Sequence, residues 1–366
     1  MANPNRKMVT LRRIDDVQPI DGADRIELAV VGGWNVVVKK GEFKAGDIAI
    51  YHEIDSFLDT TRPEYSFLDA TRSMVIDGKE VMGHVLRTRR MRGVYSQGLL
   101  IDPRQVLDLP DSVIEELCNN RADLSKAFGV VEYYKPMASP DFIGRYDPYV
   151  GPRTDAERIQ NVSQETWDLA KRTEYFVSVK VDGTSITMVY DERVNRLRIF
   201  SHNNEFDITK GMGKLAYDCA VEQGLVDFCL DEHNITLQME LCGPKINGNR
   251  LALERPRLFV FSVWDMVRKR YDNPYEWLID DNPKQSNLVP SGVASIDGFE
   301  TPKDFLEYVD GLKGSVTKGR LDEGMVVHIL EQGDLNDDEW QSLKLELSDQ
   351  LQIKAVSNKY LLKAGE

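Results

Sequence analysis

The stretch VSVKVDGTSITMVY, residues 177–190, places a lysine inside a pattern of alternating apolar residues. The alternation runs on both sides of the Gly-Thr-Ser sequence at 183–185, which predicts two strands joined by a tight turn. In the first strand, Lys180 and Asp182 share the polar face, one pleat apart. Such a pair can be a solvated ion pair worth about 0–1 kcal/mol. It can also be a rigidly held nucleophilic amine beside a carboxylate.

Composition and length indicate a globular protein with more than one domain. The chain has 366 residues, enough for two domains of ordinary size, and its 42% hydrophobic and 29% charged residues are typical of globular proteins. No segment approaches the roughly 20 apolar residues that span a membrane, and the first residues lack the apolar core of a signal peptide. The cysteines and histidines show no metal-binding spacing, so we expect free thiols in a reducing cytoplasm. We also expect no membrane partner and a monomer.

Charge is unevenly distributed along the chain. The net charge of −14 argues against a protein that coats nucleic acid through its average charge. Basic residues nevertheless gather in LRTRRMRG, residues 86–93, and in VVVKKGEFK, residues 36–44. Each set can be a solvated surface or a local channel that contacts a nucleic acid backbone.

The chain divides into two halves of different character. Short alternating runs with glycines in residues 1–125 predict a small β-barrel, and residues 110–129 read as helical. Residues 133–154 are rich in proline, glycine and tyrosine, which is typical of an interdomain connection. Further on, helical segments at 155–172 and 211–225 alternate with strand-like runs, so the second half predicts an α+β or mixed-sheet domain.

Strand-like segments of the second half carry polar residues of the types that a nucleotidyl site needs. Glu240 lies on the polar face of ITLQMELCG, and Glu323 precedes the strand GMVVHIL. Phe261 offers an aromatic face, and Lys354 lies among apolar residues near the C-terminus. Each alone is more often a structural or surface residue. Together with the lysine and aspartate quoted first, they provide an amine, three carboxylates, an aromatic platform and a second cation, which suits attack on a nucleoside triphosphate.

The same segments resemble a known family. KVDGTS resembles the KxDG motif of the ligases and mRNA capping enzymes, and SHNNE, LQMELCGPKINGNRLAL, FVFSVWD, EGMVVH and IKAVSNKYLLK resemble the later motifs in the right order. In the N-terminal half, PIDGADRIELAVVGGWNVVVKKGEFKAGDIAIYHEIDSFL and RTRRMRGVYSQGLL resemble the N-terminal OB domain of the nick-sealing ATP-dependent RNA ligases of the Deinococcus and Naegleria type, the fifth RNA ligase family. DNA ligases and capping enzymes place their OB domain after the catalytic one, so this order favours the RNA ligases.

The resemblance implies both a fold and an activity. The expected fold class is α+β, with an OB-type β-barrel at residues 1–130, a linker at 131–152, and a nucleotidyltransferase domain of antiparallel sheets and flanking helices at 153–366. The expected enzyme is an ATP-dependent RNA ligase that uses ATP and Mg²⁺ or Mn²⁺. It would seal 3′-hydroxyl and 5′-phosphate RNA ends at nicks in a duplex, through a lysyl-AMP intermediate and an RNA-adenylate.

The resemblance also implies roles for individual residues. The catalytic residues would be Lys180, as the nucleophile, with Asp182 and Lys354. The nucleotide would be bound by Arg158, Gln160, Val181, Glu240, Phe261, Val326 and Lys354, with the adenine stacked on Phe261. Metal ions would be held through water by Asp182, Glu240 and Glu323. RNA would be contacted by Arg87, Arg89, Arg90, Arg92, Lys245 and Arg250.

Two positions depart from the family pattern. Many relatives carry arginine where this chain has His202, and the last motif, often Lys-x-Lys, begins here with Gln352. The lysines that could compensate are Lys344, Lys359 and Lys363. The residues themselves leave open another lysine-dependent nucleotidyltransferase, either a DNA ligase or an mRNA guanylyltransferase. They also leave open an RNA-binding protein whose catalytic half has decayed.

Overall fold

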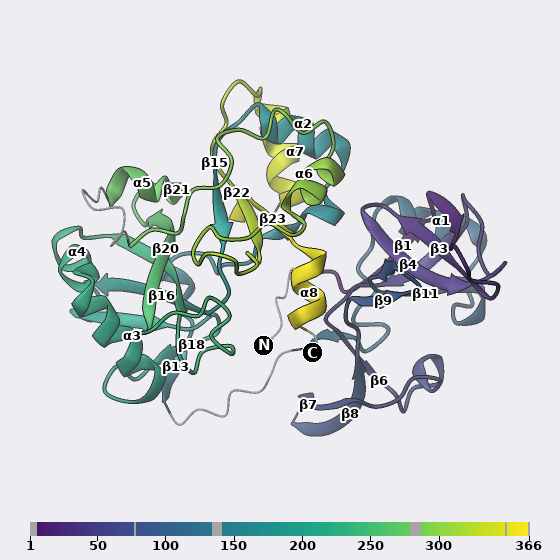
Figure 1. Cartoon of the computed structure of the whole chain (residues 1–366), viewed down its shortest axis with the longest axis horizontal. Coiled ribbons are helices and arrows are strands. Elements are labelled where there is room, and N and C mark those ends of the chain that lie inside the picture. Colours follow the sequence, from purple (N-terminus) through teal and green to yellow (C-terminus); the bar gives the residue numbers. More distant parts are fainter. Residues whose placement is uncertain (1–5, 77, 134–140, 279–286, 348–349, 365–366) are drawn as a thin grey trace. The chain divides into compact units, whose positions relative to one another are not determined.

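The computed structural model describes residues 6–76, 78–133, 141–278, 287–347 and 350–364, which form two compact units (Figure 1). Unit 1 comprises Met1–Ala138 with Leu361–Glu366, and unit 2 comprises Ser139–Tyr360. Within the described ranges, no helix is both long and apolar enough to span a membrane.

Unit 1 consists of short antiparallel strands. One sheet has the order β1-β5-β11 (Val9–Arg13, Ile48–His52 and Leu99–Ile101), and a second has the order β2-β3-β4 (Asp16–Pro19, Ile26–Val31 and Trp34–Lys39). A third has the order β12-β6-β8-β7 (Val131–Glu132, Ser56–Asp59, Lys79–Val85 and Arg72–Ile76). The remaining elements are the hairpin β9–β10 (Arg89–Met91 and Val94–Ser96), helix α1 (Asp111–Asn119) and the 3-10 helices η1 (Pro63–Tyr65) and η2 (Pro103–Gln105). Side chains buried alternately along these strands form the core, as Trp34, Val36 and Val38 do in β4.

Unit 2 contains a seven-stranded antiparallel sheet. Its order is β13-β18-β17-β16-β19-β20-β21 (Phe142–Arg145, Asn204–Phe206, Arg196–Phe200, Thr184–Asp191, Ile235–Cys242, Arg257–Asp265 and Arg270–Asp272). The helices α3 (Gly211–Glu222) and α4 (Leu225–Asp231) pack on this sheet around a core that includes Ile186, Leu237 and Val260. Smaller elements are η3 (Pro148–Val150) and α5 (Pro274–Trp277).

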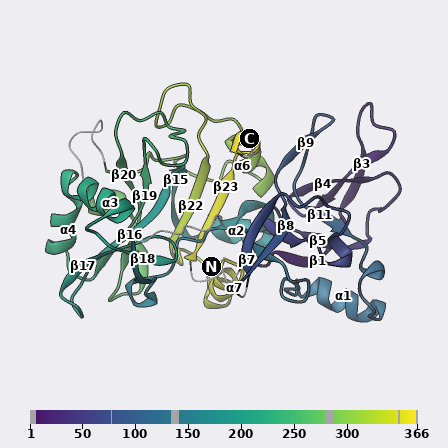
Figure 2. The ribbon, with the colours of Figure 1, turned by 90° about the horizontal axis from the view of Figure 1, so that it is seen from below.

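The second sheet of unit 2 has four strands. Its order is β14-β23-β22-β15 (Glu157–Arg158, Gln352–Val356, Gly324–Glu331 and Glu174–Lys180), and Figure 2 shows β22 and β23 side by side. The helices α2 (Gln164–Lys171), α6 (Pro302–Val309) and α7 (Asp337–Leu347) pack around a separate core that includes Trp167, Phe305 and Val327. The described part of the chain ends in α8 (Asn358–Ala364).

The segment that opened the sequence analysis crosses from one sheet of unit 2 to the other. Its two predicted strands are present as β15 and β16, but they do not pair with each other. Instead, β15 pairs with β22, and β16 pairs with β17 and β19. The turn at residues 181–183 therefore joins two sheets, leading from β15, an edge strand of one sheet, to β16, a central strand of the other.

Two local predictions differ from the structure. Residues 155–172, expected to be helical, contain the short strand β14, the 3-10 helix η4 (Ile159–Asn161) and only then α2. The segment 133–154, expected to be a connection, contains β13, which pairs with β18 in the seven-stranded sheet, while residues 134–140 lie outside the described part of the chain. In both segments, pairing with distant strands overrides a local composition that is rich in polar residues or in proline and glycine.

Candidate active site

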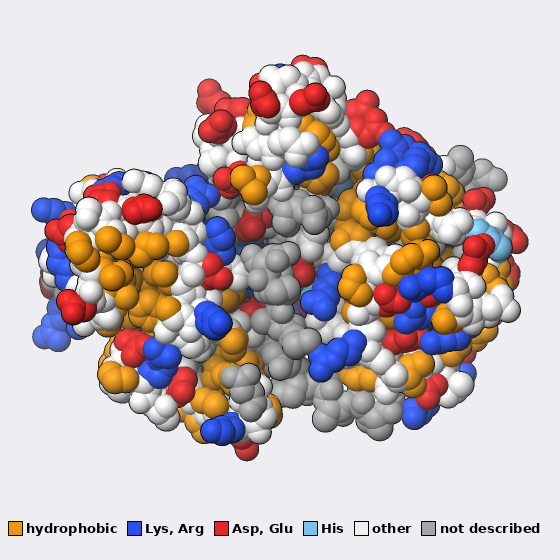
Figure 3. Space-filling model, turned by 180° about the vertical axis from the view of Figure 1, so that it is seen from behind, with side chains coloured by type: hydrophobic (Ala, Val, Ile, Leu, Met, Phe, Trp, Pro, Cys, Tyr) orange, Lys and Arg blue, Asp and Glu red, His pale blue; other side chains and the backbone are white. Residues whose placement is uncertain are grey.

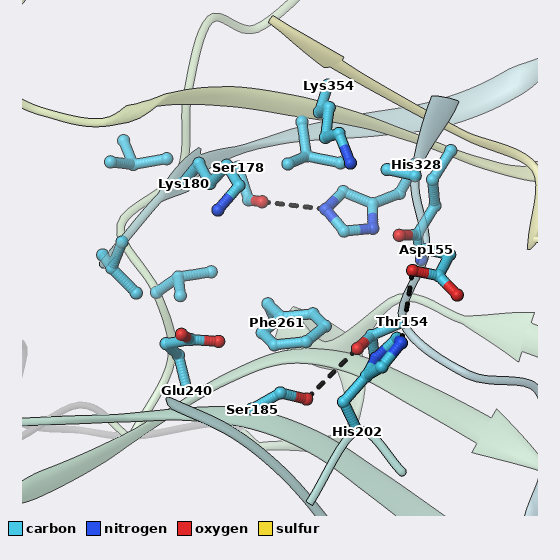
Figure 4. A pocket seen from close by; sticks show the side chains of 16 residues that line it. Thr154, Asp155, Ser178, Lys180, Ser185, His202, Glu240, Phe261, His328 and Lys354 are labelled. Carbon is cyan, nitrogen blue, oxygen red and sulfur yellow. Dashed lines mark hydrogen bonds and ion pairs between the residues drawn. The ribbon is translucent and has the colours of Figure 1, made fainter. Parts of the chain in front are cut away.

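A cavity of about 270 Å³ lies between the two sheets of unit 2 (Figure 4). Strands β15, β22 and β23 line one side, and strands β16, β19 and β20 line the other. The lining residues are Thr154, Asp155, Ala156, Ser178, Val179, Lys180, Val181, Ser185, His202, Glu240, Phe261, Val289, Val326, His328, Gln352 and Lys354. Six of them are site residues predicted from the sequence, namely Lys180, Val181, Glu240, Phe261, Val326 and Lys354.

Lys180 is the last residue of β15. Its Nζ donates a hydrogen bond to Glu323 Oε1 at 2.7 Å, and the two side chains are 28% and 16% exposed. Burial lowers the pKa of Lys180, but the carboxylates of Glu323, Glu240 and Asp182 together outweigh it, so the pKa of this ammonium lies above its usual value. In the protein alone the amine is therefore held protonated.

Glu240 faces Ser185 across the pairing of β19 with β16. Its Oε1 accepts a hydrogen bond of 3.0 Å from the Gly183 N–H. This close approach requires glycine, because a Cβ at position 183 would lie 2.3 Å from the carbonyl oxygen of Leu241. Burial raises the pKa of Glu240 to about 8, which Lys180 opposes and the neighbouring carboxylates reinforce. A cation bound nearby would therefore lower the pKa of Glu240 and favour its ionised carboxylate.

Asp182 was expected beside Lys180 on one pleated strand, and this expectation is wrong. Strand β15 ends at Lys180, so the alternation that would align the two side chains stops before Asp182. The Asp182 carboxylate accepts hydrogen bonds from Asn247 Nδ2 at 3.1 Å and from the hydroxyl of Tyr360, and it forms an ion pair with Arg250 Nε at 3.3 Å. Asp182 does not line the cavity. It joins the turn after Lys180 to the loop that follows β19 and to helix α8.

The carboxylates near Lys180 fit a hydrated divalent cation. Among the described residues, no three His, Cys, Asp or Glu side chains are grouped closely enough to ligate one metal ion directly. Carboxylate oxygens are nevertheless the donors that Mg²⁺ and Mn²⁺ prefer, and Mg²⁺ usually keeps several of its waters. Glu323 Oε2 is buried and has no hydrogen-bond partner within the described residues. This orphaned oxygen and the raised pKa of Glu240 indicate a site that lacks positive charge.

The two sheets contribute apolar walls to the same cavity. Phe261 enters it from β20 and Val326 from β22. An aromatic ring on one side and an aliphatic side chain on the other are suited to hold a flat base between them. The predicted positions of Phe261 and Val326 on opposite walls thus agree with the geometry, and their roles stay predictions.

Polar pairs also line the cavity (Figure 4). Ser178 Oγ and His328 Nε2 are 2.8 Å apart, and Thr154 Oγ1 and Ser185 Oγ are 3.1 Å apart. The remaining pair joins His202 Nε2 to Asp155 Oδ1 at 3.5 Å. His202, noted as a departure from the family pattern, therefore lines the cavity next to an acidic side chain.

Four other predicted binding residues lie outside the cavity wall. Arg158 and Gln160 are only 8% and 4% exposed, and the cavity is lined instead by the residues just before them, Asp155 and Ala156. Lys245 and Arg250 lie in the loop after β19, where Lys245 has a left-handed backbone with a φ of 69°. In this part of the chain the cavity wall is thus formed by residues upstream of Arg158, while the roles of Arg158, Gln160, Lys245 and Arg250 stay predictions.

Gln352, which departs from the Lys-x-Lys pattern of the last motif, also lines the cavity. Gln352 is 4% exposed and lines the wall beside Lys354. Of the lysines that could compensate, Lys344 lies over the ring of Trp340 at 5.5 Å, Lys359 lies 3.9 Å from Asp310, and Lys363 lies in α8. None of these three lysines lines the cavity.

The predicted RNA-binding arginines lie in unit 1. Arg87 forms an ion pair with Asp55 and lies over the ring of Tyr133 at 5.5 Å. The other three, Arg89, Arg90 and Arg92, are exposed on the β9–β10 hairpin and its turn. Figure 3 shows basic and acidic side chains interspersed over the face that it displays. The hairpin thus carries a local cluster of positive charge on a protein with a net charge of −14.

Sequence reasoning missed five polar residues of the cavity, Thr154, Asp155, Ser178, Ser185 and His328. The signal for two of them was available, because Ser178 and Ser185 lie in the stretch quoted first and Ser178 shares the polar strand face with Lys180. His328 is buried within an apolar run, where sequence alone favours a core histidine.

Comparisons with known proteins agree with this geometry. A family model described as an OB-fold domain matches residues 8–103, and one described as RNA ligase matches residues 173–343. No curated protein matches the sequence. A mutant of the Naegleria gruberi RNA ligase, solved with AMP and Mn, has 26% identity and a TM-score of 0.77, covering 98% of this chain and 99% of that chain.

Two further structures of the Naegleria gruberi enzyme are similar over their whole length. A mutant solved with ATP and Mn has 27% identity and a TM-score of 0.76, covering 98% of this chain and 99% of that one. The enzyme solved with PPi has 27% identity and a TM-score of 0.75, covering 98% of both chains. These findings confirm the α+β fold with an N-terminal OB domain and the predicted family. The chain carries an RNA ligase domain and is similar over its whole length to an ATP-dependent RNA ligase of the nucleotidyltransferase superfamily.

Proposed function

We propose that this RNA ligase seals 3′-hydroxyl and 5′-phosphate ends at nicks in duplex RNA, and that Lys180 carries AMP covalently between ATP and the RNA. The observation that supports this most directly is the position of Lys180. Its Nζ reaches the cavity that Phe261 and Val326 enter from opposite sheets, and it is held by Glu323 at 2.7 Å. A rigidly placed amine beside a slot for a base is the arrangement that nucleotidyl transfer requires.

In the first step, Lys180 Nζ would attack the α-phosphorus of ATP. The N–P bond forms while the bond to the bridging oxygen breaks, and pyrophosphate leaves in line with the amine. The amine has to be neutral to attack, whereas the surrounding carboxylates favour its protonated form in the protein alone. Phe261 and Val326 would hold the adenine, and Lys354 would face the phosphates from β23.

The carboxylates near the amine give the site its electrostatic character. Glu240 and Glu323 would hold the hydrated metal, while the Asp182 carboxylate would fix the turn after Lys180 through Asn247 and Tyr360. A divalent cation supplies charge stabilisation for the α-phosphate and for the departing pyrophosphate. Glu323 accepts a hydrogen bond from Lys180 Nζ and would orient this amine until the nucleotide binds.

In the second step, an oxygen of the RNA 5′-phosphate would attack the phosphorus of the lysyl-AMP, so that the N–P bond breaks and the Lys180 amine leaves. The third step would release AMP. The 3′-hydroxyl attacks the activated 5′-phosphate, the new phosphodiester forms, and AMP leaves. The exposed arginines of the β9–β10 hairpin would bind the RNA backbone, together with Lys245 and Arg250 near the active site. Contacts of this kind position the duplex and carry no sequence information.

Two measurements test the proposal. Incubation with radiolabelled ATP or GTP should label the protein covalently with ATP and not with GTP, and the adduct should be acid-labile, as a phosphoramidate is. Sealing should then be measured on a panel of nicked duplexes with RNA or DNA on each side of the nick. Labelling with GTP would indicate a guanylyltransferase. Sealing of all-DNA nicks as fast as RNA nicks would indicate a DNA ligase, and no covalent adduct at all would indicate an RNA-binding protein.

A further inference from the structure

Two facing residues of the four-stranded sheet present polar side chains to the cavity. In this sheet, His328 of β22 faces Gln352 of β23, and Val326 faces Lys354. Directly opposed residues of antiparallel strands have Cβ atoms about 4.5–5.5 Å apart on the same face. His328 and Gln352 are therefore neighbours on the wall that also carries Val326, and both line the cavity.

Both side chains are buried and keep an unused polar atom. His328 is 2% exposed and Gln352 is 4% exposed. Within the described residues, His328 Nδ1 and Gln352 Nε2 have no hydrogen-bond partner. Buried polar atoms without partners are rare in native proteins, because each costs about 1–3 kcal/mol. A ligand in the cavity could satisfy both atoms, because they lie on adjacent residues of its wall.

The His328 ring is held in a fixed orientation. Its Nε2 is hydrogen-bonded to Ser178 Oγ at 2.8 Å, and the ring stacks on Phe176 with a centroid distance of 4.3 Å and an angle of 2° between the planes. Figure 4 shows the ring above Phe261, with one nitrogen directed to Ser178. Burial lowers the pKa of His328 to about 3, so the imidazole is neutral and one nitrogen donates while the other accepts.

We propose that His328 and Gln352 select the nucleotide by reading the Watson–Crick edge of adenine. In this arrangement the His328 Nε2–H donates to Ser178 Oγ, so Nδ1 accepts a hydrogen bond from the exocyclic amine of the base. The Gln352 amide donates from Nε2 to the adjacent ring nitrogen N1. An acceptor beside a donor on the protein matches a donor beside an acceptor on adenine. The inference rests on the proposed binding of ATP in this cavity and adds the residues that choose its base.

Guanine and hypoxanthine present the reverse pattern on this edge. Each has a carbonyl oxygen where adenine has an amine, and an N1–H where adenine has a bare nitrogen. Two buried hydrogen bonds would therefore become two mismatches. A good bidentate contact to a base typically discriminates by about 10- to 100-fold.

The wild-type protein alone provides a first test. The rate of self-labelling per nucleotide concentration, kcat/KM, should be compared for ATP, for purine riboside triphosphate, which lacks the amine, and for inosine triphosphate. We expect purine riboside triphosphate to be about 10-fold less effective than ATP and inosine triphosphate about 10- to 100-fold less effective. Equal values for ATP and purine riboside triphosphate would overturn the proposal.

Two variants then test the residues individually. The H328F substitution keeps an aromatic ring against Phe176 and removes both nitrogens. The ratio of kcat/KM for ATP to that for purine riboside triphosphate should therefore fall close to one. Replacing Gln352→Glu puts an acceptor where the donor was, which should favour the N1–H of inosine triphosphate and shift the ATP-to-inosine ratio by about 10-fold or more. A merely structural role would lower all rates together and leave the ratios unchanged, and that result would refute the assignment.

Calorimetric binding of the same three triphosphates separates this inference from the proposed function. If the wild-type protein labels with no nucleotide, covalent catalysis fails, but the order of the dissociation constants still decides whether the base is read. If labelling occurs and neither variant changes the order, the proposed function stands and the base-reading pair is wrong. Circular dichroism and thermal melting of each variant identify those that fold. Should H328F fail to fold, Q352E and the wild-type series decide the question.

Discussion

Replacing Glu240 with glutamine should stabilise the metal-free protein while it removes activity. Burial raises the pKa of the Glu240 carboxyl from its ordinary 4.5 to about 8, against the opposing effect of Lys180. A glutamine of the same shape has no charge to bury, and its Oε1 can keep the 3.0 Å hydrogen bond from the Gly183 N–H. The substitution therefore removes an electrostatic cost without removing the contact.

The magnitude follows from the proton linkage. Between pH 4.5 and 8 the folded state binds a proton at Glu240 that the unfolded state has released, so stability falls as pH rises through this window. The slope is about 1.4 kcal/mol per pH unit, which would amount to about 3 kcal/mol at pH 7. Because the side chain is partly open to water, we expect a stabilisation on the order of 1–3 kcal/mol at pH 7 that vanishes near pH 4.5.

The assay is urea unfolding at pH 5 and pH 7.5, in EDTA and without nucleotide. Four of the five tryptophans, Trp167, Trp264, Trp277 and Trp340, belong to unit 2, so tryptophan fluorescence follows mainly the unit that contains Glu240. The two compact units can unfold separately, and only the unit 2 transition should shift. An exposed control with the same change of charge is Glu254→Gln, which should shift neither transition.

The result that would refute this reasoning is a stability difference that does not depend on pH. An E240Q protein less stable than wild type at pH 7.5 would likewise show that Glu240 is not a strained carboxylate. Self-labelling with ATP should fall by about 10²–10³-fold, the usual loss when a group that stabilises developing charge is removed. A variant that is stabilised and still fully active would refute the catalytic role alone.

Three further outcomes are expected. Lys180→Met should abolish the covalent AMP adduct without loss of fold, because the Lys180 side chain lies at the cavity and not in a core. An acid-labile adduct on this variant would exclude Lys180 as the nucleophile. Glu323→Ala should lower self-labelling by about 10²–10³-fold while Glu254→Ala should not, and a normal adduct at low metal concentration would contradict the metal role of Glu323. Burial lowers the pKa of His52 to about 4, so between pH 6.5 and 4 the unfolded state binds a proton at His52 that the folded state does not bind. The free energy of unfolding of unit 1 should therefore fall by up to about 1.4 kcal/mol per pH unit as pH falls from 6.5 to 4. A unit 1 transition that does not respond to acid would show that His52 is not buried in its neutral form.

The chemistry of the site could be predicted from sequence because it depends on residue types at fixed positions of strands. Alternation placed Lys180 and Glu240 on the polar sides of their strands, and both line the cavity. Sequence alone could not show which strands pair. Strand β15 meets β22, whose residues lie about 150 positions further along the chain, and only this pairing places Ser178 against His328. Ser178 lies on the polar side of the alternation, yet it is only 1% exposed.

Asp182 shows where the alternation rule ends. The rule holds only while the backbone stays in the strand, and β15 stops at Lys180 because the chain turns to enter the other sheet. Two residues beyond that point, the Asp182 side chain is directed by tertiary contacts with Asn247, Arg250 and Tyr360, which lie 65 to 178 positions away in sequence. Burial raises the pKa of the Tyr360 hydroxyl, and its bond to Asp182 raises it further, so this hydroxyl stays protonated and donates. An aspartate whose oxygens are engaged in this way holds the lysine-bearing turn in place, and a metal would have to displace one of these partners to reach it directly.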